Sequence, residues 1–271
     1  MPDFASKILP VHFPSLTDNF GSFTEEGIAQ ECAIPGTPYR QIWSSADTIQ
    51  IYFLDNNILF QPIVRIRDVN SDEIFNTVGL AVDFPNYYFA VFLGNLAGRT
   101  IVLEVGRNQG GGFALEHTSA EMDILSPGDP RLACSYEVRF WGCADDYGVV
   151  WLDDENTLTP TLPFTIRLTE PIRRSSELYT RTISEDSAKN YSVCGSEVDF
   201  IKVMKIELSP LWWIEKIGLI MSMRNVEIDG IRYIQEAPVQ TGQQFRNYPL
   251  FKAEVLLRLA EQGNLYKLGC C

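Results

Sequence analysis

The sequence has few basic residues and only two histidines. Its 271 residues include 22 Lys and Arg against 35 Asp and Glu, which gives a formal net charge of −13. Proteins that bind a nucleic-acid backbone need clustered Lys and Arg to displace counterions. We therefore expect no nucleic-acid partner. His12 and His117 are far apart in the sequence and neither has a recognisable partner, so a histidine-based catalytic triad is not expected.

The cysteines form no metal-binding pattern. There is no CxxC pair and no Cys/His cluster with the spacing of metal ligands, so the sequence predicts neither a zinc site nor a cofactor. Because the chain does not begin with a recognisable secretory signal, we expect reduced thiols. The six residues are Cys32, Cys134, Cys143, Cys194, Cys270 and Cys271.

No stretch is long and apolar enough for a bilayer span, which needs about 20 residues. The longest candidate is LWWIEKIGLIMSM at 211–223, which is shorter and contains Glu215 and Lys216. The first 20 residues also lack the apolar core of a signal peptide. The sequence therefore predicts a soluble protein with no membrane partner.

Two common enzyme motifs are missing or incomplete. The chain contains no GxSxG nucleophile elbow. The glycine-rich stretch RNQGGGF at 107–113 lacks the Gly-Lys-Ser/Thr continuation of a phosphate-binding loop, so we interpret it as a loop between strands. With no catalytic residues identified, we expect a protein that is not an enzyme.

The pattern of the chain predicts a mainly β fold with two tandem β-sandwich-like domains. Residues 1–37 are rich in Pro, Ser, Thr and Gly, and are expected to form an extended N-terminal arm that either lies on a neighbour or serves as a lead-in. Short β-branched and aromatic runs separated by turn residues, such as TIQIYFL at 48–54, indicate a β-sandwich at 38–127. SPGDP at 126–130 is the strongest break. The second β-rich domain is placed at 128–271, and its expected strands include ELYTRTI at 177–183 and VDFIKVMKIELS at 198–209.

The second domain is expected to contain one short helix packed on its sheet and one tight hairpin. Ser209 followed by Pro210 predicts an N-cap and first helical position for a helix at 210–223. Trp212, Trp213 and Met223 could form an aromatic ligand box, but we favour a helix face that packs on a sheet. Asp229-Gly230 between alternating runs predicts a two-residue turn in a hairpin at 225–235. The expected closing strand is PLFKAEVLLRLA at 249–260.

The stretch FWGCADDYGVVWLDDEN at 140–156 is the part of the sequence most similar to an active site. Its acids could serve a glycosidase or bind calcium, and its aromatics could line a sugar site. However, YEVRFW and VVWL read as two strands of a hairpin, which would put the two acidic groups about 13 Å apart. We therefore favour a solvated hairpin. The candidate residues are Trp141, Asp145, Asp146, Tyr147, Trp151, Asp153, Asp154 and Glu155.

Residues 134–268 resemble virion structural proteins of tailed bacteriophages and prophages. The segments that carry the resemblance are YEVRFWGCADDYGVVW, FTIRLTEPI, a strand followed by PLWWIEKI, the hairpin IDGIRY and the closing strand YPLFKAEVLLRL. The resemblance implies a non-enzymatic subunit of a tail, neck or ring, assembled in the host cytoplasm. Its partners would be further copies of itself and neighbouring virion proteins. The candidate contact segments are residues 1–37, the GGG loop and NLYKLGCC at 264–271.

A carbohydrate-binding or adhesion module is the alternative function, with exposed aromatics such as Trp141 and Trp151 as sugar platforms. In that case the partner would be a host glycan. A glycoside hydrolase is the third possibility, because it would use the acids of the same stretch.

Overall fold

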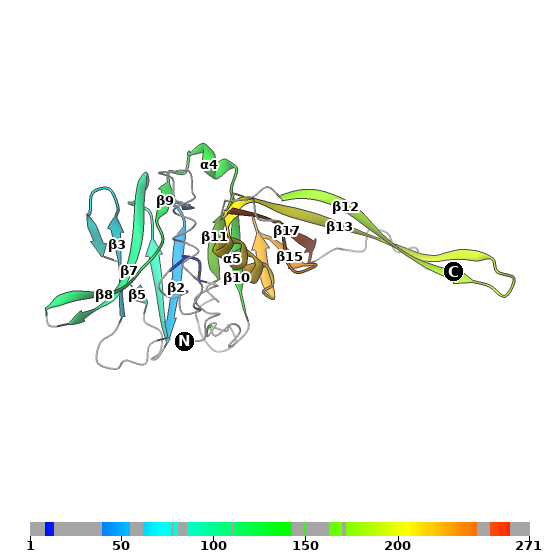
Figure 1. Ribbon diagram of the computed structural model, residues 1–271, viewed down its shortest axis with the longest axis horizontal. Helices are drawn as coiled ribbons and strands as arrows, with labels where there is room; N and C mark the ends of the chain where they lie inside the picture. The colour runs from blue at the N-terminus through cyan, green and yellow to red at the C-terminus, as the bar shows by residue number, and fades with distance from the viewer. Residues whose placement is uncertain are drawn as a thin grey trace.

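The computed structural model is a mainly β protein, which confirms the expected fold class. It describes residues 9–13, 40–54, 62–76, 79–80, 86–109, 111–142, 149, 163–169, 172–242 and 250–260. Figure 1 shows a body, made of several sheets, from which one long two-stranded ribbon extends.

Two sheets form the N-terminal half of the body. The six-stranded sheet has the order β1-β9-β7-β3-β4, with β8 also paired to β7, and the three-stranded sheet has the order β2-β6-β5. All pairings are antiparallel except β1 with β9, which is parallel. The strands are β1 Gln41–Ser44, β2 Thr48–Leu54, β3 Pro62–Asp68, β4 Ile74–Asn76, β5 Gly79–Leu80, β6 Asn86–Phe92, β7 Arg99–Gln109, β8 Gly112–Thr118 and β9 Met122–Leu125.

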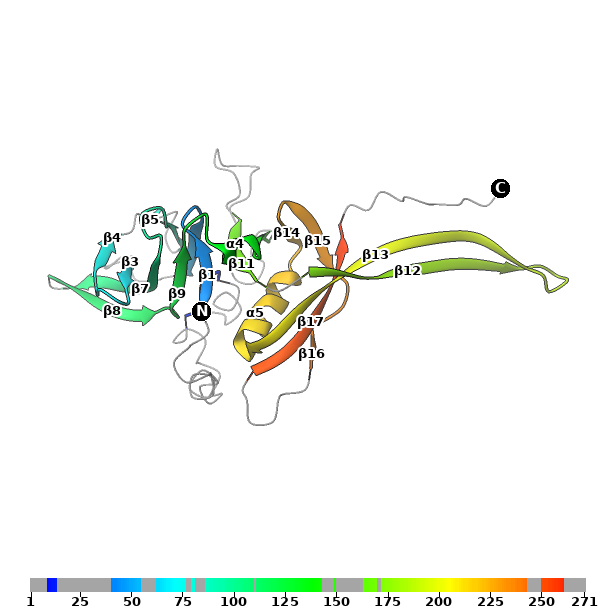
Figure 2. The ribbon, with the colours of Figure 1, turned by 90° about the horizontal axis from the view of Figure 1, so that it is seen from above.

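One antiparallel sheet of eight strands forms the C-terminal half. Its order is β11-β10-β14-β15-β17-β13-β12, with β16 also paired to β17. The strands are β10 Tyr136–Trp141, β11 Phe164–Leu168, β12 Ile172–Glu185, β13 Tyr191–Pro210, β14 Asn225–Ile228, β15 Ile231–Gln235, β16 Gln240–Thr241 and β17 Leu250–Leu259. Helix α5, Leu211–Met221, lies across this sheet against β13 and β17 (Figure 2).

The chain leaves the six-stranded sheet after β9 and enters the eight-stranded sheet at β10. The segment between these strands contains the expected boundary at residue 128. Here SPGDP leads into the short helix α4, Pro130–Ala133, whose first turn is capped by the Asp129 carboxylate. The hydrophobic core does not stop at this point. A single cluster of buried residues includes Ile51 and Leu103 from the first half and Phe140 and Val255 from the second. The two halves therefore share one core.

The expected helix and hairpin are present, but the helix runs from Leu211 to Met221 and so differs from the predicted 210–223 at both ends. Asp229 and Gly230 both have positive φ, at 49° and 75°, as the tight turn between β14 and β15 requires. Helix α5 begins after Pro210, which occupies the N-cap position without a side-chain cap hydrogen bond. The predicted Ser209 cap is therefore wrong: Ser209 is buried as part of β13, where it pairs with Phe251.

Candidate assembly surface

The ribbon formed by β12 and β13 extends away from the body (Figures 1 and 2). The two strands pair from Ile172 with Met204 to Glu185 with Tyr191. On its other edge β13 pairs with β17 only between Ile201 and Pro210. Among the described strands, the ribbon therefore has no third strand beyond Ile201.

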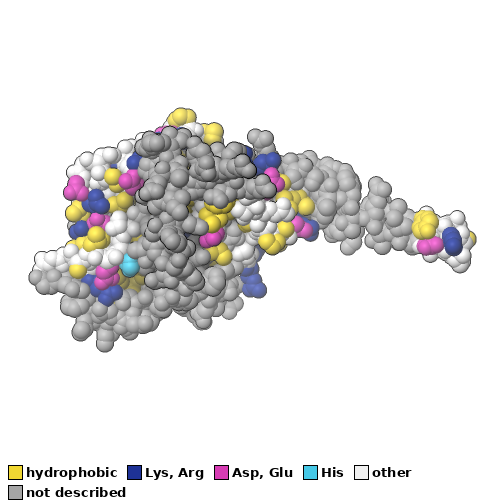
Figure 3. Space-filling model, viewed as in Figure 1, with side chains coloured by type: hydrophobic (Ala, Val, Ile, Leu, Met, Phe, Trp, Pro, Cys, Tyr) yellow, Lys and Arg dark blue, Asp and Glu magenta, His cyan; other side chains and the backbone are white. Residues whose placement is uncertain are grey.

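The turn at the tip of the ribbon is organised by Asp186. One carboxylate oxygen accepts hydrogen bonds from the backbone amides of Ala188 and Asn190 at 2.8 and 2.9 Å, and the other accepts from the Asn190 side chain at 2.9 Å. These bonds, that from the Asn190 side chain first, hold the pKa of Asp186 below its usual value. Lys189 adopts φ of 62°, and Tyr191 is 71% exposed. Figure 3 shows hydrophobic and charged side chains together at this end.

The register of the ribbon separates apolar from polar residues. Directly opposed residues in an antiparallel pair share a face, and alternate residues of one strand share a face. The pairing shifts between Thr182 and Ile183, which leaves Cys194 as the extra residue of a bulge. One face, which we call the apolar face of the ribbon, therefore contains Glu177, Tyr179, Arg181, Ile183, Glu185, Tyr191, Val193, Ser196, Val198 and Phe200.

The opposite face of the ribbon is mainly polar. It contains Leu178, Thr180, Thr182, Ser184, Ser192, Gly195, Glu197 and Asp199. Along β13 the same alternate positions continue through Lys202, whose ammonium donates a hydrogen bond to the Tyr233 hydroxyl, to Met204 and Ile206, which are buried in the core cluster.

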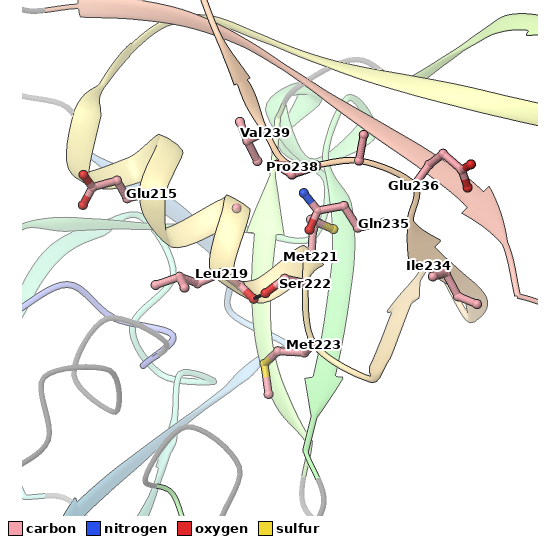
Figure 4. A pocket seen from close by; sticks show the side chains of 12 residues that line it. Glu215, Leu219, Met221, Ser222, Met223, Ile234, Gln235, Glu236, Pro238 and Val239 are labelled. Carbon is pink, nitrogen blue, oxygen red and sulfur yellow. Dashed lines mark hydrogen bonds between the residues drawn. The ribbon is translucent and has the colours of Figure 1, made fainter.

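An open groove of about 610 Å³ lies between α5 and the chain that connects β15 to β16 (Figure 4). Leu219, Met221 and Val239 give it apolar walls. Of its two glutamates, Glu236 accepts a hydrogen bond from Arg258 at 2.8 Å. The lining contains no Lys, Arg or His, so it offers no basic group to an anionic ligand.

Residues 9–13, within the expected N-terminal arm, are part of the body. Leu9, Val11 and Phe13 are at most 1% exposed. The segment contacts both halves: the His12 carbonyl accepts from the Ala120 amide at 2.8 Å, and the ring of His12 stacks on Trp212 of α5 at 3.9 Å. These five residues lie in the core of their own chain rather than on a neighbour. The rest of 1–37 lies outside the described residues.

Lys216 of α5 is buried beneath the same segment. Its side chain is 3% exposed, and its ammonium donates a hydrogen bond to the carbonyl of Leu9. Burial lowers the pKa of Lys216 to about 7, because a charged amine loses its hydration in the core. This lysine ties helix and N-terminal segment together and has no exposed surface for a substrate.

A buried ion pair also joins the two halves. Arg167 of β11 donates through Nε and Nη2 to the carboxylate of Asp47, at 2.5 and 2.7 Å. Their side chains are 14% and 6% exposed. Hydrogen bonding to Asp47 raises the pKa of Arg167 despite the cost of burial. A planar guanidinium held by two bonds fixes orientation as well as distance, so this pair sets how β11 lies beside the β1–β2 connection.

The acidic stretch at 140–156 does not form the expected hairpin. Strand β10 is flanked on both sides, by β11 from Tyr136 to Phe140 and by β14 from Val138 to Trp141. A strand has only two edges, so residues 149–152 cannot also pair along this part of β10. Between β10 and β11, residues 143–148 and 150–162 lie outside the described part of the chain. Trp141 is partly buried and packs against the core cluster, which makes it a poor sugar platform.

Most of the candidate residues of that stretch cannot be placed. The acids, with Tyr147 and Trp151, lie outside the described residues, as does NLYKLGCC. Within the described part of the chain, no group of three or more His, Cys, Asp and Glu side chains is arranged to hold a metal ion. Cys134 is exposed and outside any disulfide. None of the described helices has the length and apolarity of a membrane span.

The remaining sequence candidates belong to the scaffold. Trp213 and Met223 are 1% and 4% exposed and belong to the core cluster, so the aromatic stripe of the helix is a packing face, as favoured. His117 lies on β8 opposite Val105, and burial lowers its pKa. The expected loop at RNQGGGF is mostly strand: β7 runs to Gln109 and β8 begins at Gly112, so the stretch spans the turn between two paired strands.

No protein-family model, no curated protein and no solved structure matches this chain. The ribbon itself was not found by sequence reasoning. Its two strands were expected at 177–183 and 198–209, and the signal that could have shown their length is the absence of proline from 172 to 209.

Proposed function

We propose that the protein is a non-enzymatic structural subunit that assembles, through protein–protein contacts with copies of itself and with neighbouring proteins, into a tail, neck or ring component of a tailed-phage virion. The resemblance of residues 134–268 supports the kind of particle. The observation that carries the proposal is the ribbon, in which β12 and β13 stay paired far beyond Ile201, where the pairing of β13 with β17 ends.

An isolated ribbon lacks the contacts that stabilise a larger sheet. A two-stranded hairpin is marginally stable in water, because it has no third strand and no second layer. The ribbon has six apolar or aromatic residues among the ten of its apolar face. Large apolar patches on a protein surface are typical of protein–protein contacts. We infer a partner that covers the ribbon.

Removing the ribbon tests the assembly. A variant lacking residues 178–199, with Glu177 joined to Phe200 through Asn-Gly, keeps the pairing at the base and the whole body. We expect the full chain to form oligomers in sedimentation velocity and the shortened chain to be a monomer with unchanged near-ultraviolet circular dichroism. An equal oligomer size for both chains would contradict a role of the ribbon in assembly.

A pair of matched variants separates the two faces. Tyr179→Ser with Val198→Ser alters the apolar face, and Thr180→Ser with Thr182→Ser alters the polar face of the same ribbon. We expect the first to weaken association at least tenfold and the second to leave it unchanged, because apolar area removed from water drives association. Mass spectrometry of particles purified from cells that carry the gene tests the virion assignment. Particles without the chain would refute it.

A further inference from the structure

Residues 9–13, which we call the N-terminal segment, are held in the body by polar contacts to their backbone. The segment belongs to no helix or strand, so its peptide groups depend on other partners. The Gln41 side chain supplies two of them: its Nε2 donates to the Pro10 carbonyl at 3.0 Å, and its Oε1 accepts from the His12 amide at 3.4 Å. One carboxamide thus offers the backbone both a donor and an acceptor, as a neighbouring strand would.

The contacts to the N-terminal segment come from both halves of the body. Gln41 lies on β1, and Ala120, whose amide donates to the His12 carbonyl at 2.8 Å, lies between β8 and β9. Lys216 of α5, which donates to the Leu9 carbonyl, belongs to the other half. Gln41 and Lys216 are 4% and 3% exposed. Because buried polar groups need hydrogen-bond partners, side chains placed in this way form a groove suited to a peptide backbone.

The side chains of the N-terminal segment fill the same groove. Leu9, Val11 and Phe13 are at most 1% exposed, and the ring of His12 lies at 12° to that of Trp212. The sequence of the segment, LPVHF, contains no Asp, Glu, Lys or Arg. The groove therefore recognises an extended apolar segment, whose backbone is bound by hydrogen bonds and whose side chains are selected by burial.

We propose that the groove between β1, the β8–β9 connection and α5 is a peptide-binding site, and that the N-terminal segment fills it as an intrachain ligand that connects the two halves of the body. This inference goes beyond the proposed function, because it concerns a single chain and not its assembly. A ligand differs from an ordinary part of the core because it binds without a covalent link. The groove should therefore rebind the segment after the chain is cut between the segment and β1.

Cutting the folded full chain tests the peptide site. A protease recognition sequence with Gly-Ser flanks is inserted between Glu26 and Gly27, and the folded protein is then cleaved. We expect the released N-terminal fragment to elute with the body in size-exclusion chromatography and to exchange with an excess of a fluorescent peptide of residues 7–15, KILPVHFPS. The same peptide with Val11→Asp should bind at least about a hundredfold more weakly, because its carboxylate would enter a fully buried position.

Two variants of the cleavable chain test whether both halves hold the segment. Gln41→Ala removes the side-chain contacts of the first half, and Lys216→Met removes the ammonium of the second. We expect each to weaken binding of the fluorescent peptide about tenfold, because a buried backbone group of the peptide loses its partner. Gln240→Ala, at an exposed position of β16, is the matched control and should bind the peptide like the natural chain. Near-ultraviolet circular dichroism of each uncut variant verifies folding.

Each part of the inference can fail separately. The peptide site is refuted if the cleaved chain unfolds, if no peptide replaces the fragment, or if the natural and Val11→Asp peptides bind equally well. This comparison of two peptides does not depend on the folding of any variant. A loss of affinity in only one of Gln41→Ala and Lys216→Met, or in neither, refutes the connection between the two halves. None of these outcomes depends on whether the natural chain assembles.

Discussion

The body and the ribbon are built from strands of similar composition, but they are stabilised in different ways. In the body, β3 and β11 alternate buried and partly buried residues, because one face packs on a second layer. Buried contacts also connect the two halves, including the Arg167–Asp47 pair. The ribbon has the same alternation in sequence but no second layer among the described residues. The difference shows that an alternating strand pattern predicts an apolar face without showing which chain covers it.

The largest expected difference between the two regions is the cost of removing an aromatic side chain. Trp213 is 1% exposed in the core, so Trp213→Ala should lower the free energy of unfolding by about 4 kcal/mol. Tyr191, which is 71% exposed at the tip of the ribbon, is the matched position, and Tyr191→Ala should change it by less than about 0.5 kcal/mol. Urea unfolding of the two variants, each at a concentration at which sedimentation velocity shows a monomer, measures both. Equal costs would contradict the difference expected from the burial of the two positions.

Local pattern predicted most strands of the body but not how they are arranged. The strand predicted at TIQIYFL, 48–54, has the same bounds as β2, because its alternation and its flanking turns are local signals. The partner of β10 was wrong because pairing depends on contacts between Phe140 and Phe164, or Val138 and Ile228, which are far apart in sequence. No local signal in a single sequence reports such pairings.

The sequence did not predict the ribbon for the same reason. The strand pattern at 177–183 and 198–209 is equally compatible with a packed sheet and with a projecting ribbon. Only the end of the β13–β17 pairing at Ile201 distinguishes them. Residues 9–13 were missed for a different reason: LPVHF is too short to show a period, and its burial comes from packing against α5 and the first sheet.

The pH dependence of body stability is the next largest expected effect. Lys216 binds its proton with a pKa of about 7 in the folded protein and near 10.5 when unfolded. Between these values the unfolded chain holds more protons, so stability should rise with pH, by about 2 kcal/mol between pH 7 and 9. Urea unfolding across this range, compared between the natural chain and Lys216→Met, isolates the effect. The same change of unfolding free energy with pH in the two chains would contradict a lowered pKa of Lys216. It would mean that the ammonium contacts an acid or water.

The smallest expected effect concerns the turns at the ends of hairpins in the two regions. In the body, Gly230 has φ of 75° and open space where a Cβ would lie, so Gly230→Ala should cost about 1 kcal/mol through the backbone alone. Gly128, which has the same open space without a positive φ, is the control, and Gly128→Ala should cost nothing measurable. At the ribbon tip, Lys189 has a similar positive φ, which is unfavourable for a residue with a side chain. Hydrogen bonds to the Asp186 carboxylate stabilise that turn. A negligible cost at Gly230 would contradict the backbone strain expected from its positive φ.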